Sequence, residues 1–436
     1  MITFKKVTLS SALAVMVASC GNVEINEKST DSLVNTQGNT LNNFTCAAQS
    51  SWVFSPNNPP DEIPGGGQNL CQFYEFSWQW FISLMNKRNG EQRVYQDIAS
   101  YPVFLGLGKN SCKENTATSK LFVRTGKDNQ VTGGDFTLPA EMNQALGNAV
   151  IYDQNENIVL YQARFDKNMC NVVQSSPTLP AGTTEIKSSW RTITAADKAN
   201  YIWITSDTNN NGSIEDTELY GMVGFHLVKS TELHPEFIWA TFEHKNNAPD
   251  CQKQPNLKKS NDWSFTSKSC AIQLPTGSSI ASCNFNKTLT PAKTDDSPLT
   301  GSPTEICQVY AQGTAPGDNQ ADKNRGNIVS INAELTDIFN TLPDSNSLQV
   351  LRNYKIVGAL WENDIKQPSS VKANQRGSIQ LANTTMETNA QQGFSGVIYT
   401  SPAQVKPAAN CFDCHNYTAP EKNADVSHMF KHITGK

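Results

Sequence analysis

The sequence predicts an α+β fold, in which a β-rich, disulfide-bonded body with a few helices precedes a small C-terminal segment of different character. Short runs rich in Val, Ile, Tyr and Trp alternate with Asn, Asp, Gly and Pro clusters, one helix is strongly amphipathic, and the 436 residues include 11 cysteines. Charged residues make up only 17% of the chain and the net charge is −5, which argues against a nucleic-acid partner.

The N-terminus has the pattern of an export signal. A cationic start, Met1–Lys6, precedes an apolar run, Val7–Ser19, that is too short to cross a bilayer as a mature helix. The end of this run, Val17–Gly21, resembles a bacterial lipoprotein signal. That resemblance implies cleavage before Cys20, lipidation of its sulfur, and export to the outer membrane. The alternative is an ordinary signal peptide that leaves Cys20 free or disulfide-bonded.

One helix is predicted clearly. Across Cys71–Lys87, aromatic and aliphatic side chains recur at helical spacing and form a wide apolar stripe. A stripe of this kind belongs more often to a core than to a cofactor-binding surface. Ala140–Asn148 is a weaker helix candidate.

Most of the remaining body is predicted to form an antiparallel sheet. Its candidate strands are short, rich in β-branched and aromatic residues, and bounded by turn-forming residues. The candidates are Ala149–Tyr152, Ile158–Arg164, Tyr201–Ser206, Met222–Lys229, Phe237–Phe242, Tyr354–Trp361 and Gly396–Thr400.

The cysteine count indicates four disulfides. Setting aside Cys20, Cys411 and Cys414 from the total of 11 leaves eight, and an even number in an exported chain favours full pairing. Pairing neighbours in sequence order gives Cys46–Cys71, Cys112–Cys170, Cys251–Cys270 and Cys283–Cys307.

A twelve-residue segment, Asp207–Glu218, fits the spacing of an EF-hand calcium loop. Its flanks read as strands, so the sequence favours a lone calcium loop between two strands, and the alternative is a polar hairpin tip with fortuitous spacing. The candidate ligands are Asp207, Asn209, Asn211, Ser213 (through its carbonyl) and Glu218.

Two histidines lie on a predicted hairpin. Centring its turn near Leu233 places His226 opposite Ala240, and puts His226 and His244 on one face about 13 Å apart. This separation is too large for one metal ion. The sequence favours independent hydrogen-bonded histidines, with a substrate or redox pocket near one of them as the alternative.

The sequence Cys411-Phe412-Asp413-Cys414-His415 has the CxxCH spacing of c-type haem attachment. Two thiols at this spacing reach the two vinyl groups of one porphyrin, and the adjacent imidazole falls beneath the iron. The alternatives are a disulfide hairpin or half of a zinc site. Covalent haem is attached outside the cytoplasm, so the export signal and the motif support each other.

The sixth position of the haem iron has several candidate ligands. Asp425–Ile433 is predicted to be a short helix that carries His428, Met429 and His432, whereas Met386 lies in a polar segment upstream. His428 is favoured, then Met386, then Met429, with His432 or an open position remaining. A Met ligand raises the haem potential relative to two histidines, and an open site permits ligand chemistry.

The attachment site resembles the cytochrome c family, although only 21 residues follow His415, so upstream chain must complete the haem wall. Short motifs along the mature chain are similar to those of uncharacterised proteobacterial cytochrome c family proteins. They are Trp78–Phe81, Phe237–His244, Leu381–Thr388 and the haem motif. The resemblance implies covalent haem and names no substrate.

These observations define an expected organisation and function. We expect a lipoprotein signal peptide (1–19), a flexible tether (20–45), a β-rich body (46–344) and a cytochrome c-like haem-binding region (345–436). The favoured function is a lipid-anchored monohaem cytochrome that passes single electrons to or from an exported partner. The alternative is a haem-containing oxidoreductase whose body binds a substrate.

Overall fold

The structure is a computed structural model, and it describes residues 46–88, 90, 92–106, 108–114, 121–123, 150–208, 211–253, 255, 263–274, 283–287, 301–313, 321–388 and 411–435. The signal peptide, the tether with Cys20, the helix candidate Ala140–Asn148 and the strand candidate Gly396–Thr400 lie outside these residues. The described residues fall within one unit, Leu41–Lys436.

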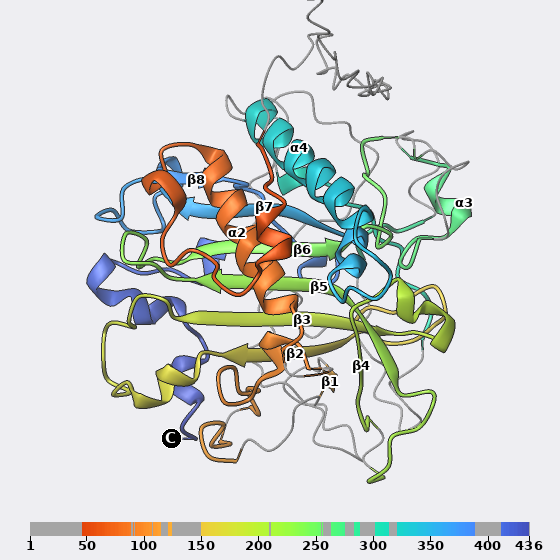
Figure 1. Ribbon diagram of the computed structural model, residues 1–436, viewed down its shortest axis with the longest axis horizontal. Helices are drawn as coiled ribbons and strands as arrows, with labels where there is room; N and C mark the ends of the chain where they lie inside the picture. The colour runs from red at the N-terminus through yellow and green to blue at the C-terminus, as the bar shows by residue number, and fades with distance from the viewer. Residues whose placement is uncertain are drawn as a thin grey trace, which may run out of the picture. The chain divides into compact units, whose positions relative to one another are not determined.

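An antiparallel sheet of eight strands forms the centre of the described chain (Figure 1). Its order is β1-β2-β3-β5-β6-β7-β8, and β4 pairs with β5. This arrangement confirms the predicted β-rich α+β class. The strands are β1 (Phe122–Val123), β2 (Leu160–Phe165), β3 (Thr184–Thr192), β4 (Trp203–Thr205), β5 (Leu219–Lys229), β6 (Ile238–His244), β7 (Tyr354–Glu362) and β8 (Gln375–Gly377).

The strand predictions are confirmed for β2, β4, β5, β6 and β7, with shifted ends. Residues 150–152 form no strand, and Tyr152 makes only an isolated bridge to Ile158. The sequence does not predict β3, although it is a central strand. One face of β3 carries the polar residues Glu185 and Ser189, which other parts of the chain bury. Because of these polar residues, the composition of β3 resembles that of a loop.

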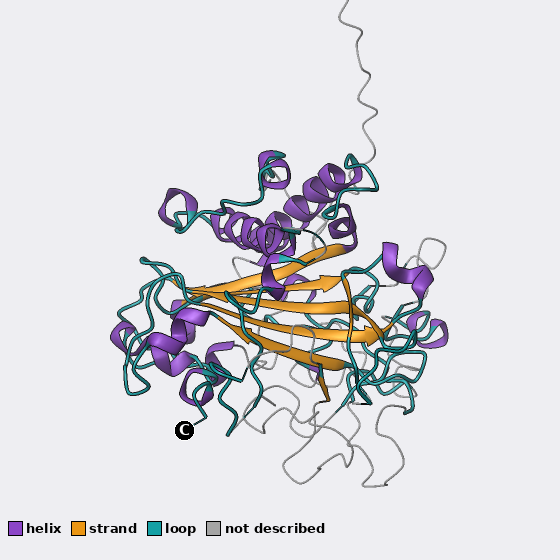
Figure 2. Cartoon of the chain, turned by 60° about the horizontal axis from the view of Figure 1, so that its bottom comes forward, coloured by secondary structure: helices purple, strands orange, loops and turns teal. Residues whose placement is uncertain are grey.

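A helical layer covers one face of the sheet (Figure 2). The predicted helix is α2 (Leu70–Met85), which begins with a capping box between Asn69 and Gln72. α2 packs on β6 and β7, and the ring of Phe81 stacks on Phe242 with centroids 4.0 Å apart. These contacts confirm that its aromatic stripe belongs to the core.

A second long helix, α4 (Ala321–Asn340), packs beside α2 and is not predicted from the sequence. Its polar composition hides a narrow stripe at helical spacing, and every member of that stripe is fully buried: Ile328, Ile331, Leu335 and Phe339. The other α-helices among the described residues are short: α1 (Ser51–Phe54), α3 (Lys268–Ala271) and α5 (Cys411–Cys414). The described 3-10 turns are Pro64–Gly66, Val94–Gln96, Lys167–Asn171, Ala195–Ala199, Ala311–Gly313, Gln349–Asn353, Lys372–Asn374, Pro420–Val426 and Phe430–His432.

Four disulfides pair the eight cysteines, two of them as predicted. Cys46–Cys71 and Cys112–Cys170 are confirmed, but the other two pairings are wrong: the bonds are Cys251–Cys307 and Cys270–Cys283. Cys251 and Cys307 are brought together where the backbone N–H of Cys251 donates to the carbonyl of Gln308, which joins the two ends of the segment 251–307. The Cys270–Cys283 disulfide therefore lies within the loop that Cys251–Cys307 closes.

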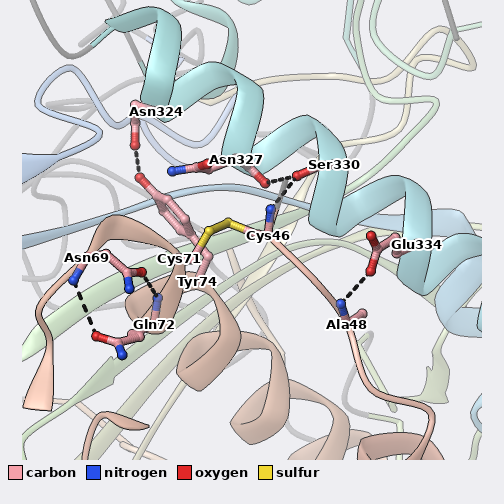
Figure 3. The surroundings of a disulfide bond; sticks show 10 residues. All are labelled: Cys46, Ala48, Asn69, Cys71, Gln72, Tyr74, Asn324, Asn327, Ser330 and Glu334. Carbon is pink, nitrogen blue, oxygen red and sulfur yellow. Dashed lines mark hydrogen bonds between the residues drawn. A yellow bond between two sulfur atoms is a disulfide. The ribbon is translucent and has the colours of Figure 1, made fainter. Parts of the chain in front are cut away.

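The first disulfide ties the start of the described chain to both long helices (Figure 3). The backbone N–H of Cys46 donates to the Ser330 hydroxyl of α4 at 2.9 Å, while Cys71 lies in α2. Nearby, the hydroxyl of Tyr74 donates to the side-chain carbonyl of Asn324. The bond thus reinforces the packing of α2 against α4.

The face of the sheet opposite the helical layer holds a second apolar cluster, to which the C-terminal residues contribute (Figure 2). The region 345–436 does not fold apart from the body, because β7 and β8 continue the same sheet. The described residues after Cys411 pack on the strands of the body. The expected boundary at residue 345 therefore does not separate two packed units.

Candidate functional site

The candidate site lies where the C-terminal segment covers the face of β3, β5 and β6. A single helical turn, α5, carries the first part of the CxxCH motif, and the His415 backbone N–H donates to the Cys411 carbonyl at 2.8 Å. This bond is of the i to i+4 type, so Cys411 and His415 lie one above the other on the turn. Cys411 is half-buried and takes part in none of the four disulfides.

His415 has the surroundings of a metal-ligating imidazole. It is buried, and its Nδ1 lies 2.7 Å from the carbonyl oxygen of Val426, so Nδ1 carries the proton and donates it. Burial, followed by the charges of Lys187 and His428, holds the pKa of His415 well below its ordinary value. The ring is therefore neutral, and Nε2 keeps the lone pair that a metal requires.

An apolar wall surrounds this imidazole. The indole of Trp239, from β6, lies 4.5 Å from the His415 ring and also contacts Phe412 edge-on at 6.0 Å. The same buried cluster includes Met386, Tyr417, Ala424, Val426, Met429, Phe430 and Ile433. Apolar surroundings of this kind suit one face of a porphyrin, and Trp239 was not singled out from the sequence as part of the site.

His428 lies beside His415, as a favoured sixth ligand should, but in a different orientation. The two rings are stacked, with centroids 4.2 Å apart and planes 23° from parallel. Two imidazoles that bind one metal end-on have centroids about 6 Å apart, because each metal–nitrogen bond is about 2 Å. His428 must therefore move outward before it can bind an iron that His415 also holds.

The segment around His428 is not the single helix predicted for Asp425–Ile433. It consists of two 3-10 turns, Pro420–Val426 and Phe430–His432, and the Ser427 hydroxyl accepts from the Phe430 N–H between them. The apolar side chains at helical spacing in this segment, Val426, Met429, Phe430 and Ile433, are nevertheless buried. Met429 is only 1% exposed and belongs to the core of this face, whereas His428 and His432 are half-buried.

The segment Leu381–Thr388, which contains Met386, is a buried polar loop. Thr384 donates from its N–H and hydroxyl to the carboxylate of Glu243, at 2.6 and 2.9 Å. Asn383 donates to the Thr241 hydroxyl at 2.9 Å. Met386 is 1% exposed and packs in the apolar cluster of this face, so it has a packing role that its polar neighbours in the sequence conceal.

The predicted hairpin register is wrong by one residue. His226 lies opposite Thr241, and side chains alternate along β6, so His226 and His244 point to opposite faces of the sheet. His226 faces the loop Leu381–Thr388, where its Nε2 lies 2.7 Å from the carboxylate of Glu387. His244 is instead buried against Tyr201 and Tyr354.

The candidate calcium loop links β4 to β5, which confirms that strands rather than helices flank it. Asp207 accepts from the N–H groups of Asn211 and Gly212, and Gly212 has a φ of +84°. Glu218 is buried and accepts from Thr208. Ser213 is exposed, and Asn209 lies outside the described residues.

No group of three or more His, Cys, Asp or Glu side chains that could hold a metal ion occurs among the described residues. In the same part of the chain, no helix has the length and apolar character needed to cross a membrane. No family model, curated protein or solved structure matches this chain.

Proposed function

We propose that this chain is an exported, lipid-anchored monohaem c-type cytochrome that exchanges single electrons with a redox partner. The observation that carries this proposal is the environment of His415 within the CxxCH motif. A buried, neutral imidazole whose Nδ1–H is held by the Val426 carbonyl has the tautomer and orientation of an axial ligand.

The residues of the site have distinct roles in this proposal. Cys411 and Cys414 form the two thioether bonds, and His415 binds the iron through Nε2. Trp239 and Phe412 exclude water from the site and supply apolar contacts. A haem c held there supplies one reversible electron and has a potential set by its ligands and burial.

The sixth ligand is His428 or Met386 in this proposal. His428 is already beside His415, whereas Met386 lies in the same apolar cluster but in a loop fixed by many hydrogen bonds. Met429 is a weaker candidate because it is part of the packed core, and His432 remains a further alternative.

Absorbance spectra test the proposal directly. The mature protein, produced in a host that matures cytochromes c, should show a c-type α-band on reduction, and a Cys411→Ala, Cys414→Ala variant should lack it. A matched control, Cys46→Ser with Cys71→Ser, should keep the band. Absence of covalent haem from the wild-type protein would refute the proposal.

Redox titration with spectra then identifies the sixth ligand. The variant that loses the low-spin spectrum, His428→Ala or Met386→Ala, reports the residue that binds iron. The stacked rather than end-on arrangement of His428 also supports a second candidate function, an oxidoreductase with an open iron site. Ready binding of carbon monoxide by the wild-type protein would favour this second function over electron transfer.

The anchor and the calcium loop complete the proposal. We propose that the sulfur of Cys20 carries the lipid on the outer membrane, at the periplasmic side or the cell surface. We also propose that the loop Asp207–Glu218 binds calcium in a structural role, with Gly212 supplying its sharp turn.

A further inference from the structure

A polar pocket lies at the end of the sheet where β6 finishes and β7 begins. Its volume of about 450 Å³ falls within the range of small-ligand sites. Its lining is rich in side-chain amides and carries charges of both signs, and none of the lining residues belongs to the proposed haem site. The pocket therefore requires an explanation of its own.

The base of the pocket is rigid. The rings of Tyr201 and His244 stack with centroids 4.2 Å apart and planes 16° from parallel, and Tyr354 contacts His244 edge-on. His244 is held by Asn200 and Asn246, because its Nε2 lies 3.2 Å from the Asn200 carbonyl and its Nδ1 accepts from the Asn246 N–H. A ligand that enters this pocket therefore meets a preformed surface.

The charges that line the pocket are balanced. Arg191 is paired with Asp153, at 2.8 Å. The other charged lining residues are Lys245 and Asp197, which carry opposite charges. His244 adds no charge, because burial lowers its pKa to about 3. A charged ligand of either sign therefore gains no net attraction from the lining.

Three side-chain amides at the pocket are available to a ligand. Asn155 and Asn200 are exposed and Asn246 is half-buried. Their backbone groups are hydrogen-bonded, whereas their side chains make no hydrogen bond to the described residues. Each amide combines donors and an acceptor on one side chain, as each hydroxyl group of a ligand does. An anion would use only the donors, and a cation only the acceptors.

An indole supplies an apolar surface beside these amides. Trp263 lines the pocket and is half-buried, and an antiparallel bridge to Thr266 fixes its backbone. Its N–H is buried, so the ring alone is available to a ligand. An exposed part of an aromatic ring suits the C–H groups of a ligand whose other groups are polar.

We propose that this pocket binds a small neutral carbohydrate. Its hydroxyl groups would exchange hydrogen bonds with Asn155, Asn200 and Asn246, and the C–H face of a sugar ring would lie on Trp263. A neutral sugar offers the mixed donors and acceptors that the amides match, and it brings no charge into a lining whose own charges are balanced. The proposal is independent of the proposed haem, because it uses no residue of that site.

Isothermal titration calorimetry of the full mature protein tests this proposal with a panel of neutral sugars: glucose, galactose, mannose, maltose and cellobiose. We expect at least one of them to bind. Its affinity should be the same at about 0.01 M and about 1 M salt, because screening does not affect an uncharged ligand. Glucuronate and glucosamine, which are charged, should bind no more tightly than the neutral sugars.

The variants test the two kinds of contact. Trp263→Ala should weaken binding about tenfold, since the ring contact is lost. Asn246→Ala should weaken it about fivefold, since the amide hydrogen bonds are lost. The control is Asn168→Ala, which removes an exposed amide that does not line the pocket and should leave binding unchanged.

Four results would overturn the proposal: no binding of any neutral sugar of the panel, binding that weakens at high salt, tighter binding of a charged sugar, or equal weakening by Asn246→Ala and Asn168→Ala. Thermal unfolding of each variant checks that the fold is intact.

Discussion

Glu362, the last residue of β7, is the buried acid whose removal should have the clearest effect on stability. Glu362 is 0% exposed, and the side-chain hydrogen bond from Asn374 and the charge of Arg376 do not offset the effect of its burial. Burial, followed by the negative charge of nearby Glu236, raises the pKa of Glu362 to about 8 from an ordinary value of 4.5. The folded protein therefore holds a proton on Glu362 at neutral pH.

The direction of the stability change follows from this raised pKa. Below about pH 4.5 the carboxyl is protonated in both the folded and the unfolded chain, so its titration adds no pH dependence to the free energy of unfolding. Between about 4.5 and 8 only the unfolded chain releases the proton, and the free energy of unfolding falls as the pH rises. A shift of this size corresponds to at most about 5 kcal/mol, and we expect about 3 kcal/mol because the structure relaxes around an ionised group.

Glu362→Gln removes this titration and keeps the shape of the side chain. In guanidinium unfolding at pH 5, 6.5 and 8, the variant should match the wild-type protein at pH 5 and exceed it by about 3 kcal/mol at pH 8. Glu232→Gln, at an exposed position, should follow the wild-type curve at every pH. Parallel pH profiles for the wild-type protein and Glu362→Gln would refute the reasoning.

Three further predictions concern the disulfides, a close backbone approach and the calcium loop. Removal of the first disulfide by Cys46→Ser with Cys71→Ser, at a sequence separation of 25, should lower the free energy of unfolding by about 3.5 kcal/mol in denaturant titrations. Gly377→Ala should lower the free energy of unfolding by more than about 2 kcal/mol, because an added Cβ would clash with the Ala359 carbonyl oxygen. Its control is Gly66→Ala, at a similar positive φ but with no atom within 4 Å of the added Cβ, which should lower it by only about 1–2 kcal/mol in the same assay. Asp207→Asn should abolish the rise in melting temperature that calcium gives the wild-type protein, and no rise in the wild-type protein itself would contradict a calcium site.

The fold was predictable where the residues of an element are mostly apolar on the faces that it buries. The stripe of α2 faces the layer between sheet and helices, whereas β5, β6 and β7 are buried on both faces, and in each case the apolar pattern predicts the element correctly. β3 and α4 were missed because most of their residues are polar, and their burial depends on partners far away in the sequence.

Of the candidate site, the sequence could supply only the local motif. The CxxCH spacing marks Cys411, Cys414 and His415 as candidates, because these residues are neighbours in the chain. Trp239 and Val426 approach His415 through tertiary packing, which no local pattern records. The hairpin register failed by one residue because the connection from Ser230 to Phe237 sets it, and a shift of one residue moves a side chain to the opposite face.

In the proposed haem site, the choice of sixth ligand depends on which candidate can move. The face that receives the C-terminal segment carries the buried carboxylate of Glu243, and the loop with Met386 satisfies it through two donors from Thr384. Displacing this loop would leave a buried carboxylate without those donors, at a cost of several kcal/mol. His428 lies instead between two short 3-10 turns and is half-buried, so its ring can move outward at a lower cost. We therefore expect His428→Ala, rather than Met386→Ala, to change the haem spectrum.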